Sequence, residues 1–279
     1  MGRWAAGLCV FCALSLPVRP SAHLFAQQVA PNRATTYLFP TDVHDARAVW
    51  VNPAGLGVQR EASIYAEIAV ANPGAKGRLQ QVNAGFNARG LSLGYQRDIL
   101  DNGVRGHTYR LGLAGGAGGL AAGFAVAHYG GAGAQSTGWD VGATYAVPAG
   151  VTLGTVVNNL GQPIVRGLRQ RLTFVPSVTW RPAPLPAFAL SADARITPDS
   201  VAAYAFGVGW QTARATRWPI EIIARLDTDG GLRRGAFALG LSIGGRDRIG
   251  LIASSPGDVS RIDGASMYGL STREPTRRH

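Results

Sequence analysis

The sequence predicts an all-β fold, a transmembrane antiparallel β-barrel of about fourteen strands with a short N-terminal plug segment. Large apolar residues alternate with small ones in segments of roughly ten residues, the length that a tilted membrane strand needs. Charged residues make up 15% of the 279 residues, hydrophobic residues make up 46%, and glycine occurs 38 times. Beyond the N-terminal region, no uncharged apolar run is long enough for a transmembrane helix. Together these features are typical of a chain that crosses a membrane with strands.

Residues 1–26 are interpreted as a cleaved signal peptide. Arg3 supplies its positive charge, an apolar stretch follows, and cleavage is expected after Ala26. The two cysteines of the chain, Cys9 and Cys12, both lie inside this segment. The mature protein is therefore expected to contain neither a disulfide nor a catalytic thiol.

Residues 27–60 are predicted to form a plug or hatch segment, because they lack the strand pattern of the remaining chain. Proline at Asn52-Pro53 favours a turn, since its ring fixes φ and moves the preceding residue out of the helical region. Residues 45–51 favour a short helix, with Asp42 as its N-cap. We expect this compact apolar segment to fold into or against a barrel. The candidate plug or gating residues are Asp45, Trp50, Asn52, Pro53 and Gly55.

The stretch from Asp45 to Leu56, Asp-Ala-x-Ala-x-Trp-x-Asn-Pro-Ala-Gly-Leu, resembles the N-terminal signature of FadL-like outer-membrane barrels and of the related PorV-like proteins. Residues 157–161, Val-Asn-Asn-Leu-Gly, are similar to a turn of the PorV-like branch. The resemblance implies that the Asn-Pro-Ala-Gly element packs at the barrel mouth or in its lumen. The FadL pattern has a longer chain with large outer loops, whereas the loops predicted here are short.

Residues 61–272 are predicted to form the barrel, followed by a basic tail over 273–279. Between Val201 and Trp210, for example, aromatic and aliphatic residues alternate with alanine and glycine. A water-facing sheet surface usually carries more charge, so the small face is expected to line the lumen and the large face to meet lipid. Strands are expected near 61–70, 79–87, 91–99, 105–114, 119–129, 136–147, 151–158, 171–181, 187–196, 201–211, 218–227, 233–243, 246–255 and 265–272.

Aromatic residues on the large face support the membrane interpretation, because interfacial girdles of barrels are rich in tryptophan and tyrosine. They are Tyr95, Tyr109, Trp139, Tyr145, Trp180, Tyr204, Trp210 and Trp218. The net charge of +11 comes from scattered arginines without a basic helical face, which argues against nucleic-acid binding. At the barrel rims these arginines are instead expected to meet anionic head groups of outer-membrane lipids.

Several charged residues share the small-residue face of their strands and are expected to point into the lumen. They are Glu67, Arg110, Asp140, Asp193, Arg195, Glu221 and Arg225. One interpretation is a polar track or a hold on the plug through charge-assisted hydrogen bonds, with the residues of 193–195 facing those of 221–225 across the lumen. The other is a set of hydrated charges that balance one another.

The sequence predicts no enzyme, no metal site and no cofactor. It contains no Gly-x-Ser-x-Gly motif and no His-rich or acidic metal spacing. The glycine-rich run 114–119 lacks the Lys-Ser/Thr ending of a phosphate loop, and His128 is expected to face lipid.

Three functions remain open at this point. The FadL-like resemblance implies passive transport of small hydrophobic compounds across the outer membrane of a Gram-negative-type cell. The PorV-like resemblance and the short loops imply a membrane platform that binds proteins of a secretion or surface-assembly system. A soluble periplasmic β protein is the third alternative.

Overall fold

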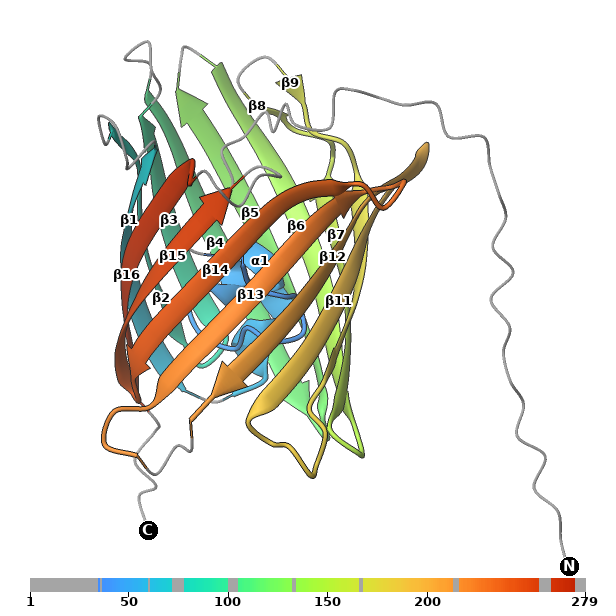
Figure 1. Cartoon of the computed structure of the whole chain (residues 1–279). Coiled ribbons are helices and arrows are strands. Elements are labelled where there is room, and N and C mark those ends of the chain that lie inside the picture. Colours follow the sequence, from blue (N-terminus) through green and yellow to red (C-terminus); the bar gives the residue numbers. More distant parts are fainter. Residues whose placement is uncertain are drawn as a thin grey trace, which may run out of the picture.

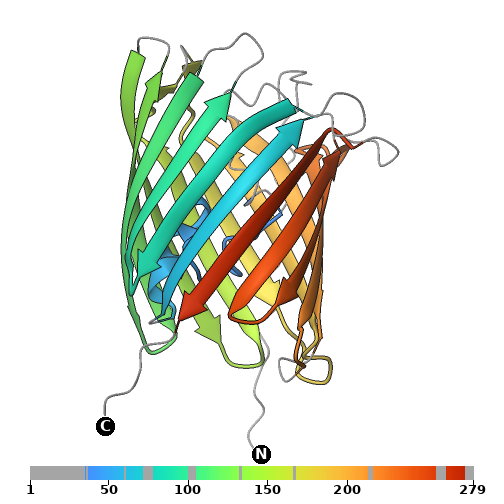
Figure 2. The same cartoon turned by 90° about the vertical axis from the view of Figure 1, so that its left-hand side faces the viewer.

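The computed structural model describes residue 35 and residues 37–59, 61–71, 78–99, 105–131, 134–165, 168–212, 216–255 and 262–273. The expected signal peptide and most of the basic tail lie outside these ranges. Fourteen antiparallel strands close into a barrel (Figure 1), which confirms the predicted fold class. The first strand pairs with the last over ten residues, so the sheet has no free edge (Figure 2).

Apart from the closing pair of β1 and β16, each barrel strand pairs with the next one along the chain, except that β7 pairs with β10. The barrel strands are β1 (Ala62–Ala71), β2 (Arg78–Ala88), β3 (Leu91–Ile99), β4 (Arg105–Ala117), β5 (Leu120–Gly131), β6 (Ala134–Val147), β7 (Val151–Leu160), β10 (Thr173–Trp180), β11 (Phe188–Thr197), β12 (Ser200–Gln211), β13 (Ile220–Asp229), β14 (Arg234–Gly244), β15 (Asp247–Ser255) and β16 (Gly264–Arg273).

The connection between β7 and β10 contains a feature that periodicity did not predict, the two-stranded hairpin of β8 (Ile164–Val165) and β9 (Leu168–Arg169). Val165 packs against Tyr129 of β5, so part of the hairpin is buried. We call the barrel end that carries this hairpin the loop end. The opposite end, where residues 89–90 join β2 to β3 and where β16 finishes, is the turn end (Figure 1).

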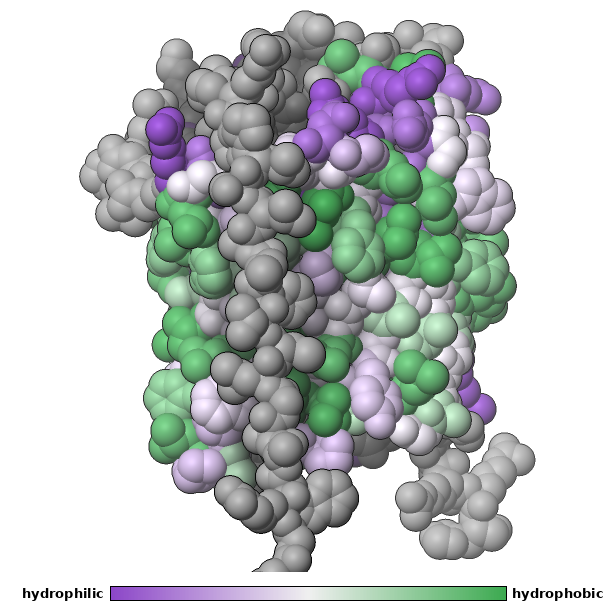
Figure 3. Space-filling view, turned by 90° about the vertical axis from the view of Figure 1, so that its right-hand side faces the viewer, coloured by the Kyte–Doolittle hydropathy of each residue, from purple (hydrophilic) through white to green (hydrophobic). Residues whose placement is uncertain are grey.

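Side chains alternate between lipid-facing and lumen-facing positions along the strands. In β1, Ile64 is 61% exposed, whereas Tyr65 and Glu67 are buried. Trp139 and Trp180 are exposed on the outer face, as predicted. Apolar residues cover the middle of the wall in Figure 3, and hydrophilic residues gather toward one end. This distribution is typical of a membrane barrel and argues against a soluble protein.

Residues 37–57 lie inside the barrel and form the plug (Figures 1 and 2). The plug contains the helix α1 (Ala48–Val51) and the 3-10 helix η2 (Pro53–Gly57). The predicted N-cap was wrong. Arg47, without a side-chain cap bond, occupies that position, and the carboxylate of Asp42 instead forms an ion pair with Arg181 beyond the end of β10.

Candidate functional site: the plug and its contacts with the barrel wall

The turn at Asn52 holds two parts of the plug together. Its side-chain oxygen accepts a hydrogen bond from the backbone amide of Ala54 at 3.1 Å, and its Nδ2 donates to the carbonyl of Pro40 at 2.9 Å. Asn52 is fully buried. Because both the oxygen and the nitrogen of the side-chain amide form hydrogen bonds, Asn52 caps η2 and also fixes the earlier turn of the plug.

Glycine allows the plug to pack tightly on itself and on the wall. A Cβ at Gly55 would lie 2.1 Å from the carbonyl oxygen of Val43, so a larger residue would separate these two plug segments. On β6, a Cβ at Gly142 would lie 1.9 Å from Oδ1 of Asn52. On β5, Gly123 faces Pro53 in the same way. The small lumen face predicted from the sequence therefore provides the space that the plug occupies.

Arg110 of β4 contacts the plug in two ways. Its Nη1 donates to the carbonyl of Val49 at 3.0 Å, and its guanidinium lies over the Trp50 ring, 5.2 Å from the ring centroid. The same Nη1 lies 2.6 Å from Oδ2 of Asp140 on β6. Gly94 leaves room for the Trp50 ring, because a Cβ there would approach it to 2.8 Å. Arg110 thus joins one plug carbonyl, one plug ring and one wall carboxylate.

Arg225 of β13 repeats this arrangement on another part of the wall. Its Nη1 donates to the carbonyl of Leu38 at 2.7 Å, and its guanidinium lies 4.5 Å from the centroid of the Phe39 ring. Its Nη2 pairs with Asp227 at 2.9 Å and with Asp193 at 3.2 Å. We call Arg110 and Arg225, with these carboxylates, the two arginine clamps.

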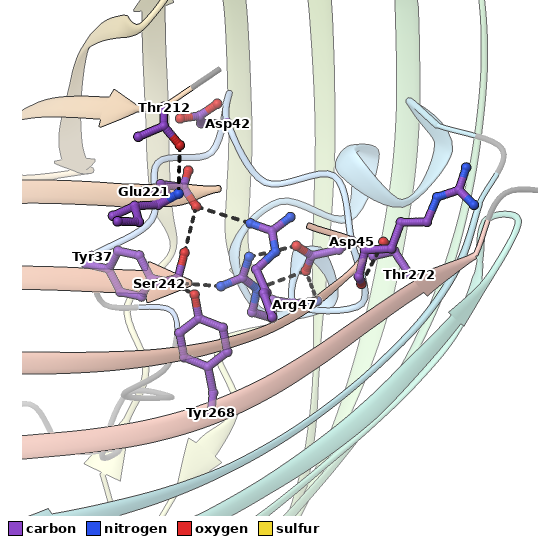
Figure 4. Close-up of polar contacts among 12 residues, drawn as sticks. Tyr37, Asp42, Asp45, Arg47, Thr212, Glu221, Ser242, Tyr268 and Thr272 are labelled. Atoms are coloured by element: carbon purple, nitrogen blue, oxygen red, sulfur yellow. Dashed lines mark hydrogen bonds and ion pairs between the residues drawn. The ribbon is translucent and has the colours of Figure 1, made fainter. Parts of the chain in front are cut away.

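A third contact starts from the plug itself (Figure 4). Arg47 binds both carboxylate oxygens of Asp45, donates to the hydroxyl of Tyr37 at 2.8 Å and lies over the ring of Tyr268 on β16. Burial alone would raise the pKa of Asp45, but the guanidinium of Arg47 outweighs this effect and holds that pKa below its ordinary value. The guanidinium therefore favours the ionised form of the Asp45 carboxylate.

Hydroxyl groups fasten the plug to the wall as well. Thr41 lies 2.7 Å from the hydroxyl of Thr179 and 3.2 Å from that of Ser177, both on β10. On β1, Ser63 accepts a hydrogen bond from the amide of Ala46 at 2.8 Å. Sequence reasoning missed these residues and the aromatic residues Tyr37 and Phe39, because threonine, serine and tyrosine are common in strands and carry no distinctive spacing.

The structure brings together only some of the predicted lumen charges. Asp193 of β11 and Arg225 of β13 form an ion pair on the same part of the wall, whereas we expected these residues to face each other across the lumen. Glu221 pairs with Arg248 of β15 at 3.1 Å. Arg195 lies on the same face of β11 as Asp193.

Glu67 belongs to a separate buried network on β1 to β3. Its carboxylate accepts a hydrogen bond from Asn83 at 2.8 Å, Asn83 also donates to Gln81, and Gln81 donates to Asp98. All four side chains are fully or almost fully buried. Because these hydrogen bonds link three neighbouring strands, they stabilise the wall.

Neither a metal site nor a membrane-spanning helix is found in the described part of the chain. Those residues contain no group of three or more His, Cys, Asp or Glu side chains that could hold a metal ion. No helix among them has the length and apolar character needed to cross a membrane.

The chain matches no protein-family model and no curated protein. Solved structures do share its fold. The toluene transporter TbuX of Ralstonia pickettii is 12% identical with a TM-score of 0.54, and the match covers 81% of this chain and 93% of that one. The toluene transporter TodX of Pseudomonas putida is 11% identical with a TM-score of 0.51, over 84% and 94%. A FadL homologue of Pseudomonas aeruginosa is 12% identical with a TM-score of 0.49, over 86% and 95%.

At these identities the likeness shows the fold alone. Two of these proteins, TbuX and TodX, are named as toluene transporters. The Asn-Pro-Ala-Gly-Leu signature and the PorV-like alternative are not tested by the likeness and stay predictions.

Proposed function

We propose that this protein is a passive channel for small hydrophobic compounds in the outer membrane, gated by the plug. The observation that carries the proposal is the pair of arginine clamps. Each clamp holds the plug through one carbonyl and one aromatic ring, while its carboxylate partners belong to the wall. Such contacts can break and re-form without disturbing the strand pairing of the barrel.

The plug composition favours a hydrophobic cargo. Ala46, Ala48, Val49 and Leu56 are fully buried, so the layer that they form excludes water. An open water-filled pore for ions would need a continuous polar lining at this level. The transporters TbuX and TodX, whose names specify toluene, share this barrel fold, and we extend a hydrophobic cargo to this chain on that basis.

The direction of transport follows from the two barrel ends. Membrane barrels of bacteria place their short turns and both termini on the periplasmic side. We therefore assign the turn end to the periplasm and the loop end to the outside. The plug contacts the wall toward the turn end, at Gly115 and Arg181, so cargo would enter from the loop end and meet the plug inside the barrel.

Toluene uptake by cells that lack their own aromatic transporters tests the proposal. Cells with the wild-type chain should accumulate toluene faster than cells with an empty vector. Replacing Asn52 and Pro53 by alanine should change this rate, because it removes the bonds that shape the plug.

Asn158 and Pro219, which lie outside the plug, provide a matched control when they are replaced by alanine. Recovery of each variant in the outer membrane, with a heat-dependent shift in gel mobility, shows that the barrel has folded. Wild-type uptake equal to the empty vector with a folded barrel would reject transport of this probe. Equal uptake by the Asn52/Pro53 variant and the wild type would reject gating.

A further inference from the structure

A groove of about 590 Å³ opens on the outer face of the barrel over β1 to β5. Most side chains that line it point outward and are apolar. Ala84 forms its shallow part, and beneath it the directly paired Gly85 and Gly94 carry no side chain on the lumen side. Larger outward residues border this depression, namely Ile64, Phe86, Leu93 and Leu111. The lipid-facing wall therefore has a recess between these larger side chains.

A polar aromatic row borders the groove toward the loop end. Tyr95 and Tyr109 are directly opposite each other on β3 and β4, with ring centroids 5.2 Å apart. The hydroxyl of Tyr95 lies 2.8 Å from Nδ1 of His107. His128 pairs with Tyr109 from β5 and is also exposed on this face. Aromatic rings with polar tips are typical of the boundary between acyl chains and head groups.

Two arginines lie one step farther toward the loop end. Arg97 follows Tyr95 on the same face of β3 and pairs with His107, while Arg105 pairs with Ile99. The two arginines are thus diagonal neighbours on the outer face, about 7 Å apart at the backbone. Among the described residues, neither has an acidic partner.

An unpartnered arginine on a lipid-facing wall is costly unless an anion or water meets it near the interface. We propose that this face binds one anionic lipid, with an acyl chain in the groove and a head-group phosphate on Arg97 and Arg105. The planar guanidinium fork suits phosphate oxygens. The line from Ala84 past Tyr95 to Arg97 runs along the wall toward the loop end, which is the direction in which a lipid molecule would lie against the barrel. This inference is independent of what the lumen transports.

Native mass spectrometry of the purified full chain tests the site. The protein is mixed with equal amounts of dioleoylphosphatidylglycerol and dioleoylphosphatidylcholine. The wild type should retain one phosphatidylglycerol with about a tenfold preference, because each basic side chain near the head group favours the anionic lipid. The double variant R97Q/R105Q should lose this preference. The variant R171Q, at an exposed arginine on the rim, should keep it.

A second pair of variants tests the groove. A84F fills the recess and should lower retention of phosphatidylglycerol, whereas A122F places the same ring on an exposed outward site of β5 and should not. A heat-dependent gel shift confirms that every variant is folded. The proposal is overturned if R97Q/R105Q keeps the preference, if R171Q loses it equally, or if A84F and A122F retain the same amount of lipid.

Discussion

Gly142 shows how one wall residue determines where the plug sits. A Cβ at this position would lie 1.9 Å from Oδ1 of Asn52, the oxygen that caps η2. At Gly115 on β4, by contrast, a Cβ would have no heavy atom within 4 Å. Gly142 faces the lumen and touches the turn of the plug, whereas Gly115 shares the exposed outer face of Leu111 and Leu113.

We therefore expect G142A to weaken plug docking by about 1–3 kcal/mol, the usual cost of overpacking a tight site. Hydrogen exchange of residues 37–57 should accelerate, while exchange of the strands should stay slow. G115A adds the same methyl group on the outer face of the barrel, so it is the control and should exchange like the wild type. Equal plug exchange in G142A and G115A would show that the contact with Asn52 does not hold the plug.

Arg225 uses several nitrogen atoms at once, which lysine cannot reproduce. Nε and Nη2 bind Asp227, Nη2 also meets Asp193, and Nη1 binds the carbonyl of Leu38. The side chain of Arg225 is 3% exposed, so loss of its charge leaves the buried Asp193 without its ion-pair partner.

R225Q is expected to destabilise the plugged barrel by about 3–5 kcal/mol, as for other buried pairs that lose one partner. R225K should recover only part of this loss, because a single ammonium nitrogen cannot reach all the oxygens that the three separate nitrogens of the guanidinium contact. R171K, on an exposed ion pair, should be neutral. Urea-dependent gel mobility of the folded form measures these differences, and an R225K protein as stable as the wild type would contradict the geometry.

At the scale of elements, the plug contains an acid-sensitive residue. Burial lowers the pKa of His44 below its ordinary value of 6.5, although Asp42 and Asp45 oppose this effect and Arg181 adds to it. A docked plug therefore prefers neutral His44. Its docking free energy is complete above about pH 6.5 and declines as the pH falls through the lowered pKa.

Plug hydrogen exchange, corrected for its intrinsic pH dependence, should consequently accelerate as the pH is lowered from 8 to about 5. H44Q should show a smaller change, because glutamine does not titrate. An H44Q profile identical to that of the wild type would assign the acid sensitivity to another group, such as Asp45.

Strands were the elements that sequence could predict well, because alternation repeats over ten residues and turn residues mark most joints. The limits of β3 agree at both ends, and those of β1 differ by one residue. The β8–β9 hairpin was missed because two residues are too few to show a period. The N-cap at Asp42 was wrong because the helix begins only at Ala48, and Asp42 instead pairs with Arg181, 139 positions away.

The candidate site was only partly predictable for a related reason. Strand parity indicates that Arg110 and Arg225 face the lumen, but it does not indicate which lumen residue each one meets. That choice depends on barrel closure and on the path of the plug, which place Leu38 and Val49 beside strands far away in the sequence.

At the scale of the whole molecule, the central claim is that movement of the plug controls passage through the barrel. The hydroxyl oxygens of Thr41 and Thr179 are 2.7 Å apart, so cysteines at both positions lie close enough for a disulfide between plug and wall. The only native cysteines are Cys9 and Cys12 of the expected signal peptide, so the mature background is expected to lack other thiols.

The decisive measurement is toluene uptake by T41C/T179C cells before and after a reductant is added, with T41C alone as the control. We predict slow uptake while the disulfide holds the plug, recovery to the wild-type rate on reduction, and no redox effect in T41C. Equal uptake in the oxidised and reduced states of a fully cross-linked protein would contradict plug gating.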